Sequence, residues 1–280
     1  MRVFAEEPRA PAAAGRRDGR LSFRRVGERT VIDAALARSP LRLLTPRNHG
    51  RAAWAYTSTL GGGLVDGDDL RLELDVGRDA CALLASQGHN RVYRSVAGCG
   101  SEVVADVNRG AFLAVVPDPT VCFAGARYRQ RTEVRLAPGA GAVVVDVLAA
   151  GRSARNERWA FRSYSGELVL WMSDRPVVHE RTLLDQEHGP VAERLGRFDV
   201  LCTILLAGEL LHTARTSLAS SLAVAPLHPR ADAVEQANDV GDALVVRLAA
   251  VSLEQALRTV RERLAFLPEL LGDDPWARRP

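Results

Sequence analysis

The residues that could do chemistry in this chain lie in a few short polar segments. Gly61–Gly67 has the glycine content of a phosphate loop, but it lacks the Gly-x-Gly-x-x-Gly spacing and the Lys-Ser/Thr pair that contacts phosphate and magnesium. Asp66, Asp68 and Asp69 could begin a calcium loop, but Gly77 occupies the twelfth position from Asp66, where a bidentate glutamate is required. The sequence therefore predicts neither a nucleotide site nor an EF-hand site.

Zinc and nucleophile motifs are incomplete as well. His179-Glu180 begins like the His-Glu-x-x-His zinc motif, but Leu183 stands where the second histidine must supply a ligand. The six histidines are scattered without metal-ligand spacing, and the sequence contains no Gly-x-Ser-x-Gly elbow. A chain without a nucleophile, cofactor loop or metal cluster is more typical of a binding protein. We therefore expect no catalytic residue, no tightly bound cofactor and no stable metal site.

Four unusual loop segments remain, and each lies between stretches that favour strands. The first contains three consecutive glycines followed by a fourth, a composition that indicates positive φ angles or close approach of another backbone segment. The four segments are Gly61–Asp69, Gln87–Ser95, Pro117–Thr120 and Gly151–Trp159.

In this order the segments resemble the motifs of the urease accessory protein D family, called H in some bacteria. The resemblance covers Leu21 to Trp276, with Asp66, Arg91 and Asn156 as departures from the usual Gly, Lys and Gly. Gly62–Asp68 is similar to the family's Gly-Gly-Leu-Val-Gly-Gly-Asp loop, and Gln87–Ser95 is similar to its Gln-x-x-x-Lys-Val-Tyr-Arg-Ser segment. Pro117–Ala126 is similar to its proline loop with a following Phe-x-x-Ala, and Gly151–Glu157 is similar to its Gly-Arg-x-x-x-x-Glu segment. The Glu-Arg pair of its next strand matches Glu180-Arg181. Any single motif is weak, whereas five in the right order are specific.

The resemblance implies a non-catalytic scaffold in urease maturation. Proteins of this family bind apo-urease on one side and the accessory protein F on the other, and F docks the GTPase G, which carries nickel. By this resemblance we expect F, G and the urease structural subunits as partners, and a dimer of heterocomplexes formed through F. The family is also thought to hold an internal passage for nickel, so we expect transient nickel(II) held by weak oxygen or imidazole ligands.

The resemblance also marks individual residues. Asp68 and Glu180 are the candidates to line or guard the nickel passage. A structural role is equally open for both: Asp68 could close an Asx-turn, and Glu180 could pair with Arg181 or another surface arginine. Further family-motif positions, to which we assign no chemistry, are Gly62, Gly63, Gly67, Gln87, Tyr93, Arg94, Gly151, Arg152, Glu157 and Trp159.

The whole-chain composition sets the frame in which these loops must sit. The 280 residues are 47% hydrophobic and 25% charged, as in ordinary globular proteins, and the net charge of +3 is too small to predict nucleic-acid binding. The longest apolar runs, Ala142–Ala150 and Val200–Leu206, are far shorter than the roughly 20 residues of a membrane span. The four cysteines form no Cys-x-x-Cys pair, which favours reduced thiols. We expect a soluble cytoplasmic protein without nucleic-acid or membrane partners.

The periodicity predicts a mainly β protein with a flexible arm over residues 1–20 and a single β-rich domain over residues 21–280. Asp69–Val76 alternates apolar and charged residues as a half-buried strand does, and no internal repeat is visible. Further strands are expected at Cys81–Ala85, Arg91–Ser95, Glu102–Val107, Phe112–Val116, Thr132–Leu136, Val143–Leu148, Trp159–Tyr164, Glu167–Trp171, Val177–Leu183, Val200–Leu206 and Ala243–Leu248.

About two helices are expected toward the C-terminal end. Apolar residues recur at three- and four-residue spacing between Leu210 and Leu222, and again from Ser252, a capping residue, to Leu267, where Pro268 should stop the helix. The second helix either closes the β body or docks a partner, and we favour closure. Together these elements predict a large, flattened, β-helix-like or sandwich-like body.

Two other classes of function compete with the scaffold. One is a stand-alone hydrolase on a β scaffold, with catalytic residues such as Asp68, His89 and Asp118 assembled from distant loops. The other is a nucleic-acid binder that uses the arginines of Arg127–Arg135, which is disfavoured because their charges alternate along a strand.

Overall fold

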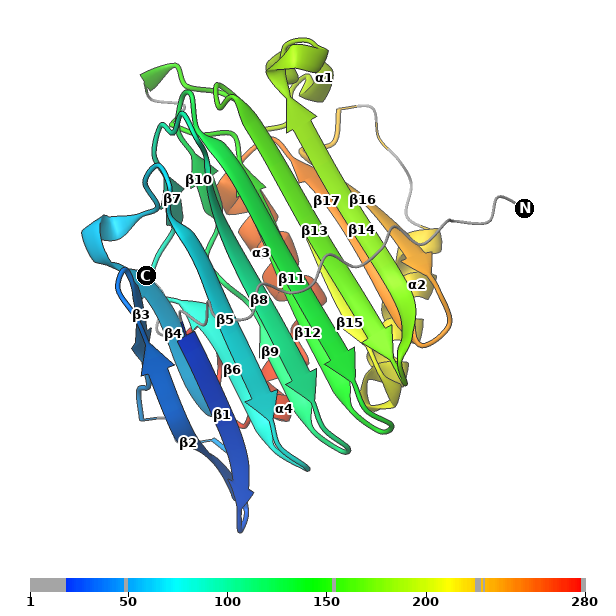
Figure 1. Ribbon diagram of the computed structural model, residues 1–280. Coiled ribbons are helices and arrows are strands. Elements are labelled where there is room, and N and C mark those ends of the chain that lie inside the picture. Colours follow the sequence, from blue (N-terminus) through cyan, green and yellow to red (C-terminus); the bar gives the residue numbers. More distant parts are fainter. Residues whose placement is uncertain (1–18, 48–49, 153–154, 225–227, 229, 278–280) are drawn as a thin grey trace.

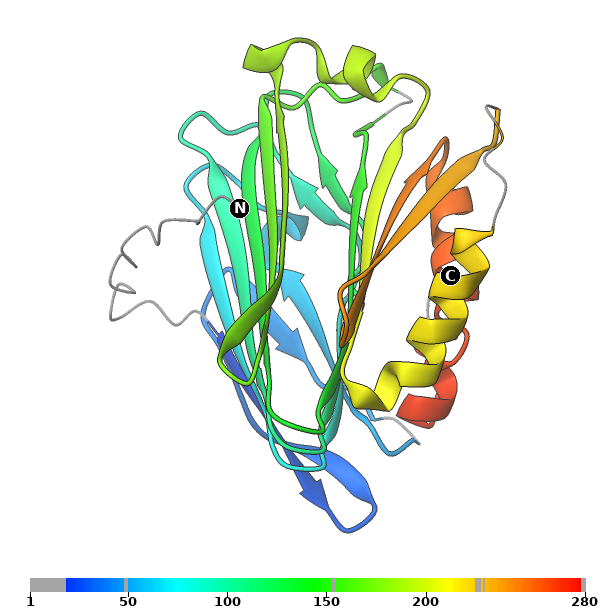
Figure 2. The same cartoon turned by 90° about the vertical axis from the view of Figure 1, so that its right-hand side faces the viewer.

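The computed structural model describes residues 19–47, 50–152, 155–224, 228 and 230–277, which form the mainly β fold that the sequence predicts (Figure 1). Residues 1–18 of the predicted flexible arm lie outside the described residues, whereas Gly19 and Arg20 already belong to the first strand. Most of the described chain is built into two large sheets that face each other (Figure 2).

Sheet A has seven strands in the order β14-β13-β11-β8-β5-β1-β2, of which β5, β8, β11 and β13 are parallel neighbours. Its strands are β1 Gly19–Val26, β2 Arg29–Ala37, β5 Asp69–Val76, β8 Cys99–Val107, β11 Arg127–Leu136, β13 Ser163–Met172 and β14 Arg175–Asp185.

Sheet B has the order β16-β17-β15-β12-β9-β6-β4-β3, with the short strands β7 and β10 pairing to each other and β10 also to β12. Its strands are β3 Leu41–Leu44, β4 Ala53–Thr59, β6 Cys81–Ser86, β7 Asn90–Val92, β9 Phe112–Val115, β10 Thr120–Cys122, β12 Gly141–Ala149, β15 Val200–Ala207, β16 Ala233–Asp239 and β17 Ala243–Ala250.

The middle of the chain winds as a flattened coil between these sheets. It passes from β4 in sheet B to β5 in sheet A, then from β6 to β8, from β9 to β11 and from β12 to β13, and each new strand lies parallel to the one a coil earlier. Parallel strands need long crossover connections, and here the facing sheet supplies them. The predicted β-helix-like or sandwich-like body is confirmed.

Three four-residue arches connect sheet A to sheet B and stack on one another, which reveals a structural repeat that the sequence did not show. In each arch the fourth residue, a buried alanine, donates its backbone N–H to the carbonyl of the first, as in Ala80 to Gly77 and Ala111 to Asn108. The third residue has a positive φ, supplied by Asp79, Gly110 and Gly139 in turn. Glycine and aspartate tolerate this geometry, so the arches share a backbone requirement rather than a sequence.

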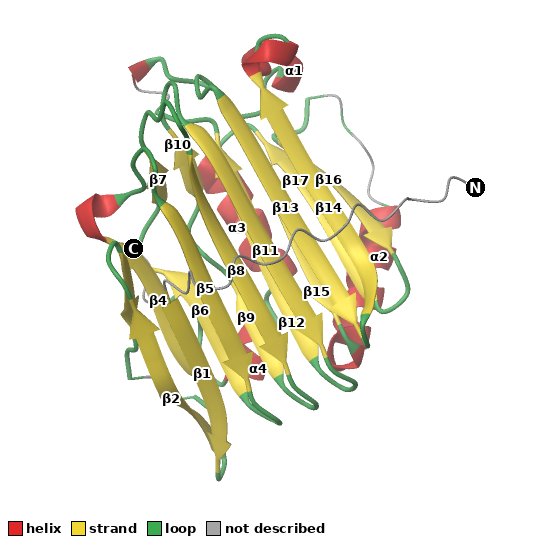
Figure 3. Ribbon diagram, viewed as in Figure 1, coloured by secondary structure: helices red, strands yellow, loops and turns green. Residues whose placement is uncertain are grey.

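Helices cover the outer face of sheet B, one short helix lies at an end of the two sheets, and no described helix covers the outer face of sheet A (Figures 2 and 3). The helices are α1 Val191–Leu195, α2 His212–Ala223, α3 Leu253–Arg263 and α4 Leu267–Leu271, and short 3₁₀ turns occupy Leu60–Gly62, Gln186–His188 and Glu209–Leu211. One apolar core lies between the sheets, and a second lies between sheet B and α2, α3 and α4.

The predicted C-terminal helix is confirmed at its start and wrong at its end. Ser252 Oγ accepts a hydrogen bond from the Gln255 backbone N–H at 3.2 Å, which is the expected N-cap. The helix stops at Arg263, and Pro268 lies in the first turn of the separate helix α4, where its missing N–H costs nothing. The buried stripe of α3 packs into the second core, so it closes the β body as we expected.

Several strand predictions are also corrected. The strands β1–β4, β10 and β16 were not predicted. The residues of β2 and β16 are largely exposed or half-buried, so little apolar alternation marks them, and β10 has only three residues. Trp159 is not in a strand: its φ is +52°, and the two strands predicted at Trp159–Tyr164 and Glu167–Trp171 are replaced by β13. The run predicted at Arg91–Ser95 is strand only as far as Val92.

Candidate functional site

The four motif segments, far apart in sequence, meet at one end of the two sheets. Backbone hydrogen bonds join them in sequence order: Leu64 N donates to Arg91 O at 2.8 Å, and Phe123 N donates to Val92 O at 2.9 Å. The third segment, taken over its full family match Pro117–Ala126, contacts the fourth where Ala124 N donates to Glu157 Oε2 at 3.2 Å. The resemblance therefore marks a set of interlocked loops near β7 and β10 (Figure 1).

The glycine-rich loop is shaped by close contacts. A side chain at Gly63 would place its Cβ 2.5 Å from Arg91 O and 2.7 Å from the Tyr93 ring, so only glycine fits there. Gly62 and Gly67 have positive φ angles of 72° and 86°. Asp68 Oδ2 accepts the Val65 backbone N–H at 2.8 Å and closes the loop, through a residue three positions earlier rather than through the Asx-turn that we left open for it.

An arginine-carboxylate pair anchors the fourth motif segment. Arg152 Nε donates to Glu157 Oε2 at 2.8 Å, and this hydrogen bond lowers the pKa of Glu157. The Arg152 guanidinium also lies 4.0 Å from the centre of the Phe123 ring, which packs edge-on against Tyr93 at 5.2 Å. These contacts hold the loops together, so a structural role explains why the family motif includes these residues.

Three further motif residues are also explained by the local backbone. A Cβ on Gly151 would lie 2.3 Å from Glu157 O, and its φ is +110°. Trp159 is fully buried and donates its indole N–H to Phe198 O at 2.9 Å. The exposed Arg94 packs its stem over Gly125, where an added Cβ would contact it at 3.2 Å.

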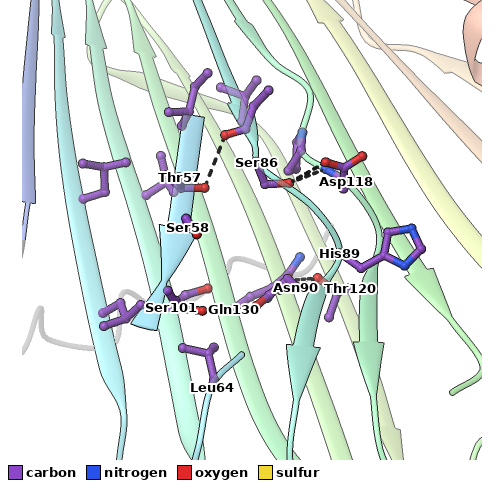
Figure 4. Close-up of a pocket in the computed structure, with 18 of the residues that line it drawn as sticks. Thr57, Ser58, Leu64, Ser86, His89, Asn90, Ser101, Asp118, Thr120 and Gln130 are labelled. Carbon is purple, nitrogen blue, oxygen red and sulfur yellow. Dashed lines mark hydrogen bonds between the residues drawn. The ribbon is translucent and has the colours of Figure 1, made fainter. Parts of the chain in front are cut away.

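A cavity of about 450 Å³ lies between the sheets beside these loops (Figure 4). Gly62 and Leu64 of the glycine-rich loop lie on its rim, together with the exposed residues Gln87 and His89. Its wall is mostly apolar, but polar side chains from both sheets also face it. The polar residues that line it include Thr57, Ser58, Ser86, Asn90, Ser101, Asp118, Thr120, Tyr128, Gln130 and Asp146.

Hydrogen bonds link these polar side chains across the two sheets. The Tyr128 hydroxyl lies 2.6 Å from Ser101 Oγ, and it accepts a hydrogen bond from Asn90 Nδ2 at 3.1 Å. Thr120 Oγ1 donates to Gln130 Oε1 at 3.4 Å. The network fixes the orientation of the oxygen atoms that face the cavity, as buried polar groups require.

Asp146 is the charged group deepest in this wall. It lies in the middle of β12, surrounded by protein yet partly exposed because it faces the cavity. Burial raises the pKa of its carboxyl, and hydrogen bonds from Gln130 and from the Tyr164 hydroxyl, at 3.3 Å, only partly offset this. Both of these partners are neutral, so the carboxylate has no compensating positive charge among the described residues that contact it.

A second cavity, of about 410 Å³, lies on the opposite face of sheet B. It is lined by Leu257, Val260 and Arg261 of α3 and by Trp276, together with outward-facing side chains of the sheet. It shares Ser86, His89 and Asp118 with the first cavity. The cleft space is therefore distributed over both faces of one sheet.

Neither Asp68 nor Glu180 lines either cavity in the described part of the chain. Asp68 holds the loop whose Gly62 and Leu64 form the rim. Glu180 of β14 accepts hydrogen bonds from both Nε, at 2.7 Å, and Nη2 of Arg247 on β17, so it joins the edge strand of sheet A to the strand next to the edge of sheet B. The alternative that Glu180 pairs with a surface arginine is the one observed, and the arginine is Arg247 rather than Arg181.

The arginines of Arg127–Arg135 lie on the outer face of sheet A, and most of them are neutralised. Arg129 pairs with Asp69, Arg131 with Glu102, Glu133 and Glu167, and Arg135 with Glu133 and Asp106. A phosphate backbone would have to displace these carboxylates. The arrangement gives no support to a nucleic-acid interface.

The comparisons with known proteins agree with this geometry. A family model described as UreD urease accessory protein matches residues 16–280. The chain is 46% identical to "Urease accessory protein UreD" of Sorangium cellulosum over 283 residues, which cover all of this chain and 88% of that protein. The chain belongs to the UreD family of urease accessory proteins.

Other UreD relatives extend the likeness to more distant organisms. The chain is 38% identical to "Urease accessory protein UreD" of Anaeromyxobacter, over 98% of this chain and 93% of that protein. It is 30% identical to "Urease accessory protein D" of rice, over 97% of this chain and 99% of that protein. The predicted family and a non-catalytic role in urease maturation are thereby confirmed. The stand-alone hydrolase finds no support, because Asp68 lies outside both cavities, whereas His89 and Asp118 line both of them.

Among the described residues, no three His, Cys, Asp or Glu side chains are grouped so that they could hold a metal ion together. No helix in the described ranges is long and apolar enough to cross a membrane.

The sequence reasoning missed the cavity wall, including Asp146, Gln130 and Tyr128. Asp146 had a signal: it is the lone charged residue in the apolar run Ala142–Ala150. A single carboxylate in a buried strand must find a partner or a cavity. The inward direction of Gln130 and Tyr128 follows from their alternation with the arginines of Arg127–Arg135, but nothing in the sequence shows that a cavity lies on that side of the strand.

Proposed function

We propose that this UreD-family chain links apo-urease to the accessory proteins F and G in the cytoplasm, and passes nickel to urease through the cavity between its sheets. The single observation that carries the nickel role is the Asp146 carboxyl, which faces the cavity among neutral oxygen donors. In this proposal nickel is cargo, held in transit and never as a resident cofactor.

The donor chemistry suits a cation in transit. Carboxylate, hydroxyl and amide oxygens bind divalent cations, but one carboxylate with neutral partners binds them weakly. Release must be possible for transfer, and a closed cluster of several charged ligands would trap the ion. The polar side chains of the cavity wall offer many such weak contacts along its length.

The proposal gives Asp68 and Glu180 supporting roles. Asp68 fixes the loop at the cavity rim, where it can guard entry, and Glu180 with Arg247 holds sheet A to sheet B along one edge. Residues 21–280 act as one unit in this scheme because the cavity needs both sheets. The assembly that we propose is a dimer of heterocomplexes formed through F.

Co-expression tests this function. Urease subunits and the other accessory proteins are expressed with and without this chain, followed by a pull-down, a urease assay and metal analysis of the purified urease. We expect co-purification with F and G, and loss of nickel from urease when the chain is deleted. Fully active urease without the chain, with nothing co-purifying, would overturn the proposal.

Point variants then separate docking from nickel passage. Asp68→Ala and Glu180→Ala should lower nickel loading of urease while the complex still forms, because Asp68 holds the loop at the cavity rim and Glu180 holds sheet A to sheet B. Unchanged nickel content with an intact complex would remove both residues from the passage.

A further inference from the structure

Sheet B is interrupted at one place, between the two cavities. β9 pairs with β12 as far as Val115 opposite Val144, and β10 resumes the pairing at Thr120 opposite Leu148. Likewise β6 pairs with β9 as far as Leu84, whereas β7 pairs with β10 only from Asn90. Residues 87–89 and 117–119 therefore leave the strands at the same level, next to Ser86, which still pairs with Thr57 of β4, and we call this interruption the window.

Backbone hydrogen bonds border the window, from Val116 N to Leu84 O at 2.8 Å and from Asn90 N to Pro119 O at 3.0 Å, and side chains hold the segment between them. Pro117 and Pro119 have no N–H to donate, so the segment between β9 and β10 cannot continue the pairing. The one amide between them, Asp118 N, donates to Ser86 Oγ at 2.7 Å, and Ser86 Oγ donates to Asp118 Oδ2 at 3.1 Å (Figure 4). A side-chain pair of this kind can open without unzipping a sheet.

The cavities on the two faces of sheet B meet at the window. Both are lined by residues 86–89, by Pro117 and Asp118, and by Val145 and Val147 of β12. On one side lies the cavity wall with Asp146, and on the other lies the space beneath α3 with Arg261 and Trp276. A path from one cavity to the other through this place needs no change in the strands themselves.

We propose that the window joins the two cavities, and that a divalent cation leaving the space between the sheets crosses sheet B there, with Asp118 and His89 as transient ligands, and emerges beside α3. The inference rests on the proposed nickel passage and adds its route. Carboxylate, hydroxyl and imidazole are donors that a borderline cation accepts, and all three line the window in Ser86, Asp118 and His89.

Single cysteines placed along the route test it after folding is complete. The native cysteines are all buried, so a bulky maleimide will select an introduced exposed thiol. Gly88→Cys lies in the window, where a Cβ meets no atom within 4 Å, Ser58→Cys lies in the first cavity only, and Arg261→Cys lies in the second only. Ser217→Cys, exposed on α2 away from both cavities, is the matched control.

Each labelled chain is assembled with its partners, checked for complex formation by size exclusion, and assayed for nickel transferred to apo-urease. We expect labels at Ser58→Cys, Gly88→Cys and Arg261→Cys to reduce transfer to the level without the chain, and the label at Ser217→Cys to leave it unchanged. A block by the Ser58→Cys label alone would overturn the route and leave the proposed function intact. No block at any position would overturn both.

A second measurement needs no partner and covers the case in which a label disturbs assembly. The rate at which a small reagent alkylates Gly88→Cys is measured in the isolated chain with and without Ni²⁺. We expect Ni²⁺ to slow alkylation, and Asp118→Asn to remove this protection while Asp118→Glu keeps it. Equal rates with and without Ni²⁺ would show that the window does not hold the cation.

Discussion

Charged side chains have different partners on the outer face of sheet A and in the cavity behind it. On the outer face, Arg71, Glu102, Arg131 and Glu167 stand side by side on four neighbouring strands and pair in a row. In the cavity, Asp146 contacts only neutral donors among the described residues. The difference teaches that charge on the outside is satisfied within the chain, whereas charge on the inside is left available for a ligand.

The pKa directions express this difference. Burial opposes ionisation of Glu133, but hydrogen bonds from Arg131 and Arg135 outweigh it and lower its pKa below the usual 4.5. For Asp146 burial wins, and its pKa lies above the usual 3.8. The same burial therefore leads to opposite outcomes according to the neighbours.

The largest stability effect should come from Glu133 of β11, which lies beside the row on the outer face and pairs with Arg131 of the row and with Arg135. Glu133→Gln leaves Arg131 and Arg135 without their most buried partner, since the Glu133 side chain is 9% exposed. We expect a loss of about 2 kcal/mol in the free energy of unfolding at pH 7, reduced from the value for a fully buried pair because both arginines reach solvent. Urea unfolding at pH 7 measures it, and an unchanged midpoint would contradict stabilisation by these ion pairs.

The pH dependence of the same variant sharpens the test. Because the folded pKa of Glu133 is lowered, its stabilisation is present above pH 4.5 and is lost as the pH falls through the folded pKa. The difference in the free energy of unfolding between the unsubstituted chain and Glu133→Gln should therefore shrink below pH 4.5. Urea unfolding repeated between pH 7 and pH 3 measures this difference. A difference that stays constant over this range would show that the charge of Glu133 is not the source of the stabilisation.

The Asp146 carboxyl in the cavity should show the opposite dependence of folding stability on pH. The raised pKa of Asp146 means that its ionisation costs stability as the pH rises above its unfolded value near 3.8. Asp146→Asn, which keeps the shape and an oxygen acceptor, should therefore gain on the order of 1 kcal/mol at pH 7, with no gain at pH 3. Thermal unfolding at both pH values checks this, and a destabilised variant at pH 7 would place Asp146 with the structural charges.

The smallest effect is expected at the edge of the outer face. Asp33 and Arg24 form an ion pair in which both side chains are nearly half exposed, and Arg24 keeps Asp75 as a second partner. Asp33→Asn should change the free energy of unfolding by less than about 0.5 kcal/mol. Urea unfolding at pH 7 is again the measurement. A loss of unfolding free energy as large as that of Glu133→Gln would mean that the burial of the ion pair does not decide its contribution.

The sequence predicted the parts of the fold in which one residue pattern decides the structure. Asp69–Val76 alternates along its whole length and forms β5 with the predicted bounds, and Ser252 caps α3 as expected. The stacked arches escaped notice because Asp79, Gly110 and Gly139 share only a positive φ. The edge strand β16 escaped because an exposed edge leaves little apolar pattern to read.

The candidate site could be predicted only where a loop motif marks it. The motif residues Gly63, Arg152 and Trp159 proved to hold the loops together at the cavity rim. The cavity wall itself is drawn from strands of both sheets, so its assembly depends on register and on the distance between the sheets. Neither property is written in a local segment, and Asp146 alone left a visible trace, as a charge within an apolar run.

Nickel in matured urease is the most direct test of the account. Urease is matured with this chain, with Asp146→Leu and with Glu133→Gln as the matched control, each shown to form the complex, and the nickel content per active site is determined by metal analysis. We expect Asp146→Leu to leave urease without nickel and Glu133→Gln to load it normally. Normal nickel content with Asp146→Leu would contradict the claim that the inner charge serves the cation.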